Sequence, residues 1–441
     1  MNNTIVGVAT CLGAPSGINI IRISGEDSFP IVKSVFYSKA TATDIWEYNK
    51  MYLGTVTGED FKERAFCVLY KAPKSYTGED VAEIHCHGGS GVTKAIFNLL
   101  INKGARPSEA GEFTKRAFLN GKLTLSEAEG VADMINAETA GQVRNAYKLM
   151  SGELTKGLEE TETALIEAAA MLEAKLDYPE ELEEETKPAA YKVLLKAKAI
   201  CDELIRSSAG TKILKNGADI AIVGIPNAGK STLLNAILKE DRAIVTPIAG
   251  TTRDVIKESV EIKGIKLNFL DTAGIRDSGY DEIEKIGIEK SRNAVKTADV
   301  VIFLSDATVD GEKEKDLLSL LDGKKSVIAV NKSDIGKYEK DGINICAKTG
   351  ENVDKLLEEV IGLLDNDGMY EKGIITNERH IAALKECVGL INDAIAAYEI
   401  MPSECIAVDI YAASSALGRI TGKSVGDDVI DEIFSRFCVG K

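Results

Sequence analysis

A phosphate-binding loop is the first chemistry that the sequence indicates. The segment from Gly224 to Ser231 reads Gly-Ile-Pro-Asn-Ala-Gly-Lys-Ser, follows the apolar run Ile220–Val223 and opens a helix-forming run. Glycines let backbone N–H groups face phosphate oxygens, and a helix N-terminus adds its dipole. Lys230 would neutralise the β and γ oxygens, and Ser231 would ligate Mg²⁺. The predicted nucleotide contacts in this loop are Asn227, Ala228, Gly229, Lys230, Ser231 and Thr232.

Two further motifs favour GTP over ATP. In the segment Asp271-Thr-Ala-Gly274, the carboxylate can hold Mg²⁺ through water, and the glycine N–H can meet the γ-phosphate. The segment Asn331-Lys-Ser-Asp334 ends an apolar run, and Asp334 can accept hydrogen bonds from guanine N1–H and the exocyclic amine, which adenine lacks. A kinase or a general ATPase is therefore disfavoured. The residues that these motifs assign to GTP are Asp271, Thr272, Ala273, Gly274, Asn331, Lys332 and Asp334.

Two more segments complete the predicted GTP site. Cys346-Ala-Lys348 stands where GTPases usually read Ser-Ala-Lys, and the Ala347 backbone should matter more than the first side chain. The segment 246–254 reads as a switch, whose Thr252 hydroxyl could reach Mg²⁺. Ile275 occupies the place where Ras-like enzymes carry a water-orienting glutamine, so another residue must position the water. These segments add Thr246, Ile248, Ala249, Gly250, Thr251, Thr252, Cys346, Ala347 and Lys348 to the GTP site.

Composition is that of a globular protein. Of the 441 residues, 44% are hydrophobic and 28% are charged, and no apolar run reaches the roughly 20 residues that a membrane span needs. The first residues lack a secretion signal, and eight cysteines without a CxxC pair predict reduced thiols, so we expect a cytoplasmic protein. The formal charge of −16 predicts that any contact with RNA uses a local basic patch.

The pattern of apolar residues along the chain predicts a multidomain α/β protein. Residues 1–120 mix short β-rich runs, at Thr4–Ala9, Ile18–Ser24, Ala65–Tyr70 and Val81–His85, with a helix near Val92–Asn102, which indicates an α+β domain. Apolar spacing of three and four residues predicts amphipathic helices in 121–214 and again in 366–441. Between them, 215–365 alternates strands, turns and helices as a doubly wound domain does, so we predict that this domain is inserted into a helical one.

These residues resemble the family of tRNA-modifying GTPases called MnmE or TrmE, and the resemblance extends over essentially the whole chain. The terminal segment Phe437–Lys441 matches the family's Cys-x-Gly-Lys, and the switch reads GTTRD at Gly250–Asp254. The amino-terminal part matches at Ile21–Gly25, Tyr76–Gly89 and Gly111–Glu129. The resemblance implies an amino-terminal folate-binding domain, a helical domain and a Ras-like P-loop GTPase domain.

The resemblance also implies a reaction and its partners. Such proteins form homodimers through the amino-terminal domain, which binds a 5,10-methylene- or 5-formyl-tetrahydrofolate. With a flavoprotein of the MnmG type that carries FAD, they add a (carboxymethyl)aminomethyl group at C5 of the wobble uridine, position 34, of certain tRNAs. Arg22, Glu83 and Lys122 match the family's folate contacts, and the terminal Lys441 would approach the same pocket.

In the same family, K⁺ beside the phosphates promotes pairing of the G domains. The implied K⁺ ligands are Asn227, Thr246, Ile248 and Thr251. Glu284 corresponds to the family's water-positioning glutamate, with Glu282 as the competing choice because of a one-residue difference in the preceding loop. The residues assigned to catalysis are Glu284, Lys230, Thr252 and Cys438, the last either with an undefined role near folate or as a small hydrophobe.

Two alternatives stay open from sequence. A ribosome-assembly or other regulatory GTPase switch would carry the same G domain but would be expected to append a basic RNA-binding module. A dynamin-like self-assembling GTPase should lack a folate site. The triplet His85-Cys86-His87 suggests a metal cluster, yet neighbouring residues on a strand point to opposite faces, so zinc is disfavoured.

Overall fold

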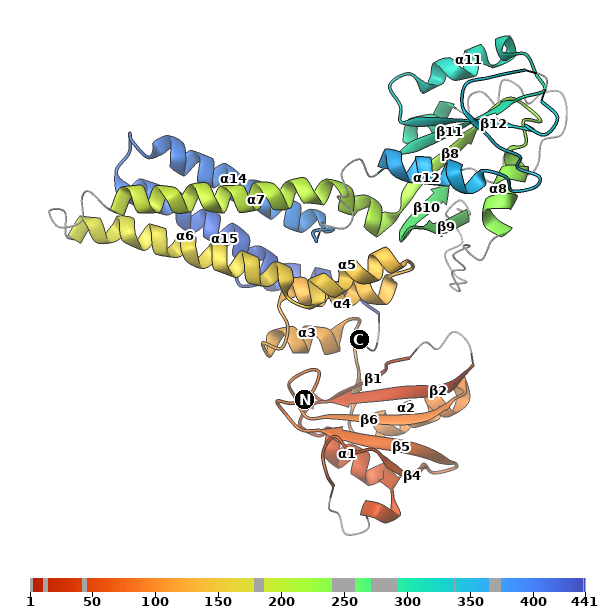
Figure 1. Cartoon of the computed structure of the whole chain (residues 1–441). Coiled ribbons are helices and arrows are strands. Elements are labelled where there is room, and N and C mark those ends of the chain that lie inside the picture. Colours follow the sequence, from red (N-terminus) through yellow and green to blue (C-terminus); the bar gives the residue numbers. More distant parts are fainter. Residues whose placement is uncertain are drawn as a thin grey trace. The chain divides into compact units, whose positions relative to one another are not determined.

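The computed structural model (Figure 1) describes residues 3–10, 15–41, 46–177, 186–239, 258–270, 292–336, 338–364, 374–438 and 440. The chain divides into two compact units. One consists of Met1–Ala132, Leu149–Ile166 and Ser414–Lys441, and the other of Asp133–Lys148 and Glu167–Ala413. Amino-terminal and carboxy-terminal residues therefore share the first unit.

A seven-stranded sheet, in the order β3-β4-β5-β6-β2-β1-β7, forms the amino-terminal part of the first unit. Neighbouring strands run antiparallel except β1 and β7. Its strands are β1 (Ile5–Val8), β2 (Ser16–Ser24), β3 (Phe36–Tyr37), β4 (Tyr52–Thr57), β5 (Lys62–Tyr70), β6 (Val81–Gly88) and β7 (Arg106–Pro107). The four β-rich runs that the sequence predicts are confirmed as β1, β2, β5 and β6.

Helices α1 (Ser28–Val35) and α2 (Ser90–Asn102) contribute to the core on one face of this sheet. The alternation of β6 explains the two faces, because side chains of a strand point alternately to opposite sides. Ala82, Ile84 and Cys86 are buried in the core with residues of both helices. Glu83 and His85 consequently lie on the other face, which leaves that face available for polar chemistry.

In the rest of the first unit, the carboxy-terminal segment packs against residues 111–128. Leu125, Ala128, Ile430, Phe434 and Phe437 form one buried cluster. These residues belong to α4 (Leu125–Asn136), to α16 (Asp427–Ser435) and to the segment that follows α16, while α3 (Glu112–Leu119) precedes α4. Beyond the cluster, the Gly111 N–H donates to the Cys438 carbonyl at 3.3 Å. The carboxy-terminal segment thus packs against the start of α3.

Long helices form much of the second unit, and α7 and α14 lie side by side in it (Figure 1). The Sγ atoms of Cys201 and Cys387 are 4.0 Å apart, and the rings of Tyr191 and Tyr398 are 5.0 Å apart between centroids. The helices are α5 (Ala140–Met150), α6 (Glu153–Asp177), α7 (Thr186–Asn216), α14 (Glu378–Ala397) and α15 (Ser403–Thr421), of which α5, α6 and α15 also contribute residues to the first unit. Within the described ranges, no helix is long and apolar enough to cross a membrane.

The strands between α7 and α14 form a six-stranded sheet in the order β13-β12-β11-β8-β10-β9, parallel except for the β9–β10 pair. The strands of this sheet and the helices between them are, in chain order, β8 (Ala218–Val223), α8 (Lys230–Lys239), β9 (Glu258–Ile262), β10 (Ile265–Phe269), β11 (Val300–Asp306), η2 (Gly311–Glu314), α11 (Lys315–Leu318), η3 (Ser319–Leu321), β12 (Ser326–Asn331), β13 (Ile343–Asn344) and, after the last strand, α12 (Val353–Leu364). All seven residues of β11 are buried, as expected for a parallel strand covered on both faces. The predicted doubly wound domain, placed between helices that pack together, is confirmed.

Candidate functional site

The phosphate loop connects β8 to α8. Asn227 and Gly229 have positive φ angles of 62° and 98°, a conformation that asparagine tolerates and glycine adopts freely. A Cβ atom on Gly229 would lie 2.4 Å from Asn331 Nδ2, and one on Gly224 would lie 2.3 Å from the Leu304 carbonyl oxygen. Both glycines are therefore required for close packing against the neighbouring strands as well as for the shape of the loop.

Lys230, the first residue of α8, folds back over this loop. Its ammonium group donates to the carbonyls of Gly224 and Ile225, both at 2.9 Å. Burial lowers the pKa of Lys230, because a low-dielectric surrounding disfavours the charged form. Ser231 and Thr232 follow at the N-terminus of the helix, where backbone N–H groups and the helix dipole favour an anion.

The predicted guanine-selecting residues contact the phosphate loop directly. The Asn331 side chain donates to the Ala228 carbonyl at 2.7 Å and accepts from the Ala347 N–H at 2.9 Å. The Lys332 ammonium donates to the Asn227 carbonyl at 2.9 Å. Three segments that are far apart in sequence therefore meet around one place in the fold.

The loop around Ala347 is held by its own backbone. The Cys346 N–H donates to the Glu351 carbonyl at 3.1 Å, and the Cys346 carbonyl accepts from Gly350 at 2.9 Å. Cys346 and Ala347 are buried, whereas Lys348 and Asp334 are exposed. Because the Asp334 side chain is exposed, its carboxylate can accept hydrogen bonds from a base.

Several predicted GTP and metal residues lie outside the described residues, and their assignments stay predictions. They belong to the switch segment, to the Asp-Thr-Ala-Gly motif and to the segment of the water-positioning glutamate. They are Thr246, Ile248, Ala249, Gly250, Thr251, Thr252, Asp271, Thr272, Ala273, Gly274, Glu282 and Glu284.

Sequence reasoning missed Asp306, the last residue of β11. Its Oδ2 atom lies 2.6 Å from the Lys332 ammonium, and its Oδ1 atom accepts from the Thr308 N–H and hydroxyl at 2.8 and 2.7 Å. Burial raises the pKa of Asp306, but the hydrogen bonds from Lys332 and Thr308 outweigh it, so its pKa lies below the usual value. The available signal was an aspartate at the end of an apolar run.

Two of the predicted folate residues, Arg22 and Glu83, lie on the face of the seven-stranded sheet opposite α1 and α2. Gly7 pairs with Arg22 across β1 and β2, and Arg22 pairs with Glu83 across β2 and β6. The Arg22 Nε atom lies 2.8 Å from Glu83 Oε1, and His85 Nε2 lies 3.2 Å from Glu83 Oε2. Strands β2 and β6 thereby place an acidic and two basic side chains in contact, and Gly7 of β1 lies beside Arg22.

Two aromatic rings lie beside Arg22 of this pair. The Arg22 guanidinium carbon lies 5.3 Å from the centroid of the Tyr76 ring and 5.7 Å from that of Phe113, distances that permit cation–π attraction. Burial raises the pKa of Glu83, but the hydrogen bond with His85 and the charge and hydrogen bond of Arg22 outweigh it, so the pKa is lowered. Sequence reasoning did not assign Tyr76 and Phe113 to the site, although both lie in segments that carried the resemblance.

The carboxy-terminal tail reaches β1, the strand next to Arg22. A Cβ atom on Gly7 would lie 2.8 Å from the Phe113 ring and 3.1 Å from Gly440 Cα, and one on Gly440 would lie 2.0 Å from the Val8 carbonyl oxygen. The pair of glycines therefore lets the tail pass beside β1, on the strand next to Arg22. Cys438 in this tail is an exposed free thiol, and Lys441 lies outside the described residues.

Lys122 is positioned by a different contact from the other folate candidates. Its ammonium donates to the Pro73 carbonyl at 3.0 Å. The loop residue Gly78 lies against it, since a Cβ atom there would be 3.3 Å from Lys122 Cγ. Lys122 therefore packs on the segment that contains Tyr76, but no direct contact with Arg22 or Glu83 is found among the described residues.

The triplet His85-Cys86-His87 divides between the two faces of β6. Cys86 belongs to the buried core, whereas His85 contacts Glu83 and His87 Nδ1 contacts Glu63 Oε1 at 2.5 Å. Among the described residues, no group of three or more His, Cys, Asp or Glu side chains is arranged to hold a metal ion. His85 and His87 instead contact the carboxylates of Glu83 and Glu63 in the same sheet.

Comparison with known proteins places both units in one family. A family model described as the MnmE helical domain matches residues 125–438, and one described as the GTP-binding protein TrmE N-terminus matches residues 4–122. Proteins named tRNA modification GTPase MnmE from Streptococcus suis and Thermotoga maritima are each 38% identical to this chain. The protein of that name from Clostridioides difficile is 39% identical. Each alignment covers 100% of this chain and 99% or 100% of the relative. The chain therefore belongs to the MnmE (TrmE) family of tRNA modification GTPases.

Proposed function

We propose that this protein hydrolyses GTP in order to modify the wobble uridine, position 34, of certain tRNAs. Family membership supports a GTPase acting in tRNA modification. The observation that carries the site assignment is the bonding of Asn331 and Lys332 to the phosphate-loop carbonyls. It joins the residues that would select guanine to those that would bind phosphate, as one nucleotide requires. The product would be a (carboxymethyl)aminomethyl group at C5 of the uridine.

The GTP site would use a divalent cation. Ser231 at the start of α8 would be one ligand of Mg²⁺. Thr252 and, through water, Asp271 would be the others. Mg²⁺ would neutralise the phosphate oxygens when it is bound, and Lys230 would add a second positive charge beside them. Glu284, or Glu282 in its place, would position the attacking water.

A monovalent cation would add to this charge. Asn227 fits the role of a K⁺ ligand because its backbone is left-handed, its carbonyl is occupied by Lys332 and its side chain is exposed. The side-chain oxygen is thus available, and oxygens of Thr246, Ile248 and Thr251 would complete the site. We propose that K⁺ bound there promotes pairing of two G domains and thereby activates hydrolysis.

The face of the amino-terminal sheet would bind the folate that donates one carbon. Arg22, Glu83 and Lys122 offer both donors and acceptors, which suits a pterin and a glutamate tail, and Lys441 would join them. Tyr76 and Phe113 add aromatic surface beside Arg22. Cys438 lies in the tail that passes next to β1, and we assign it a functional role there. A flavoprotein of the MnmG type would supply FAD.

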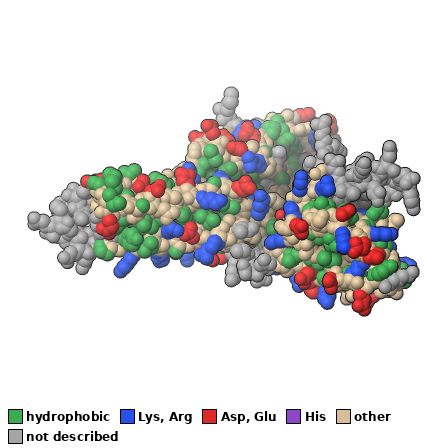
Figure 2. Space-filling view, turned by 90° about the horizontal axis from the view of Figure 1, so that it is seen from above, with side chains coloured by type: hydrophobic (Ala, Val, Ile, Leu, Met, Phe, Trp, Pro, Cys, Tyr) green, Lys and Arg blue, Asp and Glu red, His purple; other side chains and the backbone are tan. Residues whose placement is uncertain are grey.

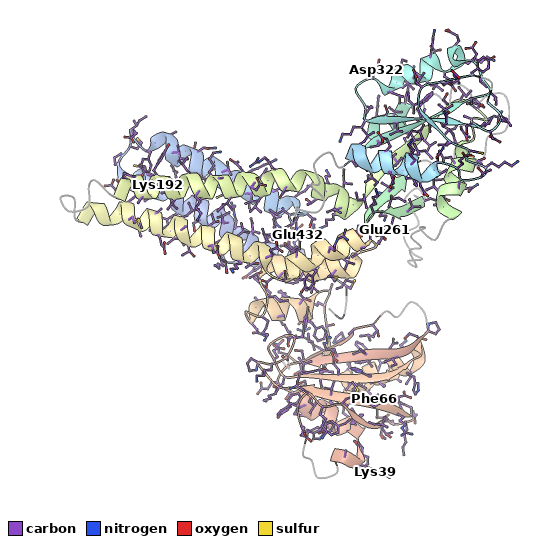
Figure 3. The ribbon with its side chains drawn as sticks, viewed as in Figure 1. Lys39, Phe66, Lys192, Glu261, Asp322 and Glu432 are labelled. Carbon is purple, nitrogen blue, oxygen red and sulfur yellow. The ribbon has the colours of Figure 1, made fainter. Side chains whose placement is uncertain are left out.

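The same sheet face supports the proposed homodimer. Ile18, Leu53 and Phe66 are exposed at 60%, 44% and 41% of their surface. Leu53 pairs with Phe66, and Phe66 pairs with His85, so these apolar side chains share the face of the folate residues; Phe66 is labelled in Figure 3. Large apolar groups on one sheet face favour a protein partner. A second copy would cover them and would place two folate sites near one interface.

Steady-state GTP hydrolysis in KCl and in NaCl tests this proposal, with the purified protein and its Asn227→Ala variant. We expect strong stimulation by K⁺ in the wild type and loss of that stimulation in Asn227→Ala. Binding of 5-formyl-tetrahydrofolate, weakened by Arg22→Met, would support the amino-terminal assignment. Turnover that is equal in the two salts would remove K⁺ from the mechanism and would favour a regulatory GTPase switch instead. We also propose that the protein acts in the cytoplasm.

A further inference from the structure

A buried ion pair links the two loops beside the predicted guanine site. The Lys340 ammonium lies 2.7 Å from Glu314 Oε2, and the two side chains are only 10% and 2% exposed. Glu314 ends the short helix η2 that follows β11, whereas Lys340 belongs to the loop that follows Asn331–Asp334. The pair thus joins two connections at the same edge of the parallel sheet.

Every polar group of this pair is used. The Lys340 ammonium donates to the Ser305 hydroxyl at 3.1 Å and to the Asp306 carbonyl at 2.7 Å, besides its contact with Glu314. The Glu314 carboxylate accepts from the Ser305 hydroxyl at 2.6 Å and from the Asp306 N–H at 2.9 Å. Three donors of one ammonium therefore meet three acceptors, and the last two residues of β11 are fixed from both sides.

The fixed strand end continues into the nucleotide site. Asp306 holds the Lys332 ammonium at 2.6 Å, and Lys332 has a left-handed φ of 61°. Lys332 in turn donates to the phosphate-loop carbonyl of Asn227. On the other side, the Tyr338 N–H donates to the Ala307 carbonyl at 3.0 Å, which fastens the same loop next to Lys340. The segment that contains Asp334 is thereby held at both ends.

Stability alone is a weak reason for such a pair. Removing two charges from water is costly, and apolar residues of similar volume often stabilise a protein equally well. What the pair supplies is a unique geometry, because each hydrogen bond fixes a direction. We propose that Lys340 and Glu314 are positioning residues that hold the segment 332–336 so that Asp334 meets the guanine edge. The inference rests on the proposed GTP site and adds a determinant of guanine selectivity to it.

Binding of GDP and of inosine diphosphate, measured by calorimetry, tests the inference. Inosine lacks the exocyclic amine that Asp334 would accept from guanine, so the ratio of the two affinities reports on the position of this loop. For Lys340→Met we expect at least tenfold weaker GDP binding and a ratio at least fivefold below that of the wild type. In hydrolysis assays, KM for GTP should rise by a similar factor while kcat changes less than twofold.

Lys315→Met is the matched control. Lys315 pairs with Glu312 next to the same short helix, but these side chains are 65% and 70% exposed, so the variant should keep both affinities. Glu314→Gln and Asp306→Asn provide milder changes if Lys340→Met does not fold, and each should lower the ratio. Equal losses for the two nucleotides, or none, would overturn the inference. Absence of any guanine preference in the wild type would instead remove the proposed GTP site itself.

Discussion

Glu83 illustrates how the amino-terminal site balances burial against charge. Its carboxylate is largely buried, which by itself disfavours ionisation, but the hydrogen bond with His85 and the guanidinium of Arg22 lower its pKa. The ionised form is therefore stabilised by folding. An N–H donor approaching this carboxylate, such as one of the proposed folate, would find an acceptor already held in place.

This balance predicts a pH dependence of stability. Because the folded-state pKa of Glu83 is depressed, its contribution is complete above the unfolded value of about 4.3 and is lost as the pH falls through the folded value. Urea denaturation of the wild type and Glu83→Gln should thus differ more at about pH 5 than at about pH 3. A difference that grew as the pH fell from about 5 to about 3 would contradict the assignment.

A second prediction concerns Asn331 in the predicted nucleotide site. Asn331→Ala would leave the buried Ala347 N–H and the Ala228 carbonyl without their partner, at a cost of about 2 kcal/mol or more. We expect a lower urea midpoint and weaker GDP binding together. Asn344→Ala is the control, since Asn344 is exposed on the neighbouring strand β13. Loss of stability with unchanged GDP binding would detach Asn331 from the nucleotide site.

At this scale, contiguous motifs were predictable and dispersed networks were not. Asn331 and Lys332 stand within one short motif, so their types and spacing indicated their chemistry. Asp306, Glu314 and Lys340 are separated along the chain and meet only because parallel strands end at one edge of the sheet. Asp306 at least ends an apolar run, but nothing in the local sequence of Glu314 and Lys340 distinguishes them from the many solvated acidic and basic residues of this chain.

At the scale of elements, the β9–β10 hairpin connects the G domain to the helices. Lys263 and Gly264 form its two-residue turn with φ angles of 50° and 84°, the conformation of a type I′ turn. Glu261, labelled in Figure 3, accepts from the Ala140 N–H at 3.0 Å at the start of α5. Lys266 forms an ion pair with Glu138 just before that helix. The hairpin is thus bonded both to the first residue of α5 and to the segment just before it.

The closeness of hairpin and helix predicts a sharp effect of one methyl group. A Cβ atom on Gly141 would lie 2.2 Å from the Gly264 carbonyl oxygen, so Gly141→Ala should force the elements apart and cost about 1–3 kcal/mol. Gly157→Ala is the matched control in α6, because a Cβ atom there meets nothing within 4 Å. That variant should stabilise the protein by about 0.5–1 kcal/mol. Thermal denaturation of both variants checks the pair, and a neutral Gly141→Ala would mean that this contact is not tight.

Some strands could be predicted from the sequence pattern and others could not. The strands β8, β10, β11 and β12 were predictable because parallel strands buried on both faces read as apolar runs. The two-residue strands β3, β7 and β13 were not, since their pairing depends on tertiary neighbours and not on local periodicity. The antiparallel strand β9, with an alternating polar pattern, was also missed.

At the scale of the whole molecule, charge constrains how tRNA could bind. The formal charge is −16, and on the face that Figure 2 presents, Lys and Arg side chains are interspersed with Asp and Glu. Such a surface gives little long-range attraction for a phosphate backbone. A tRNA contact would accordingly depend on a restricted patch and on shape, and a partner protein could supply the remaining positive charge.

The division into two compact units predicts two separable unfolding events. The G domain lies in the second unit, whereas the carboxy-terminal tail packs in the first, with Phe437 in its buried cluster. GDP at a hundred times its Kd should stabilise the second unit by about 2.7 kcal/mol and raise its midpoint by about 5–10 °C. Deleting residues 437–441 should lower only the midpoint of the first unit, because Phe437 would no longer cover Phe434 and Gly440 would no longer pack beside β1. Scanning calorimetry with and without GDP measures both shifts. If GDP and the deletion moved the same transition, the two units would unfold as one cooperative unit.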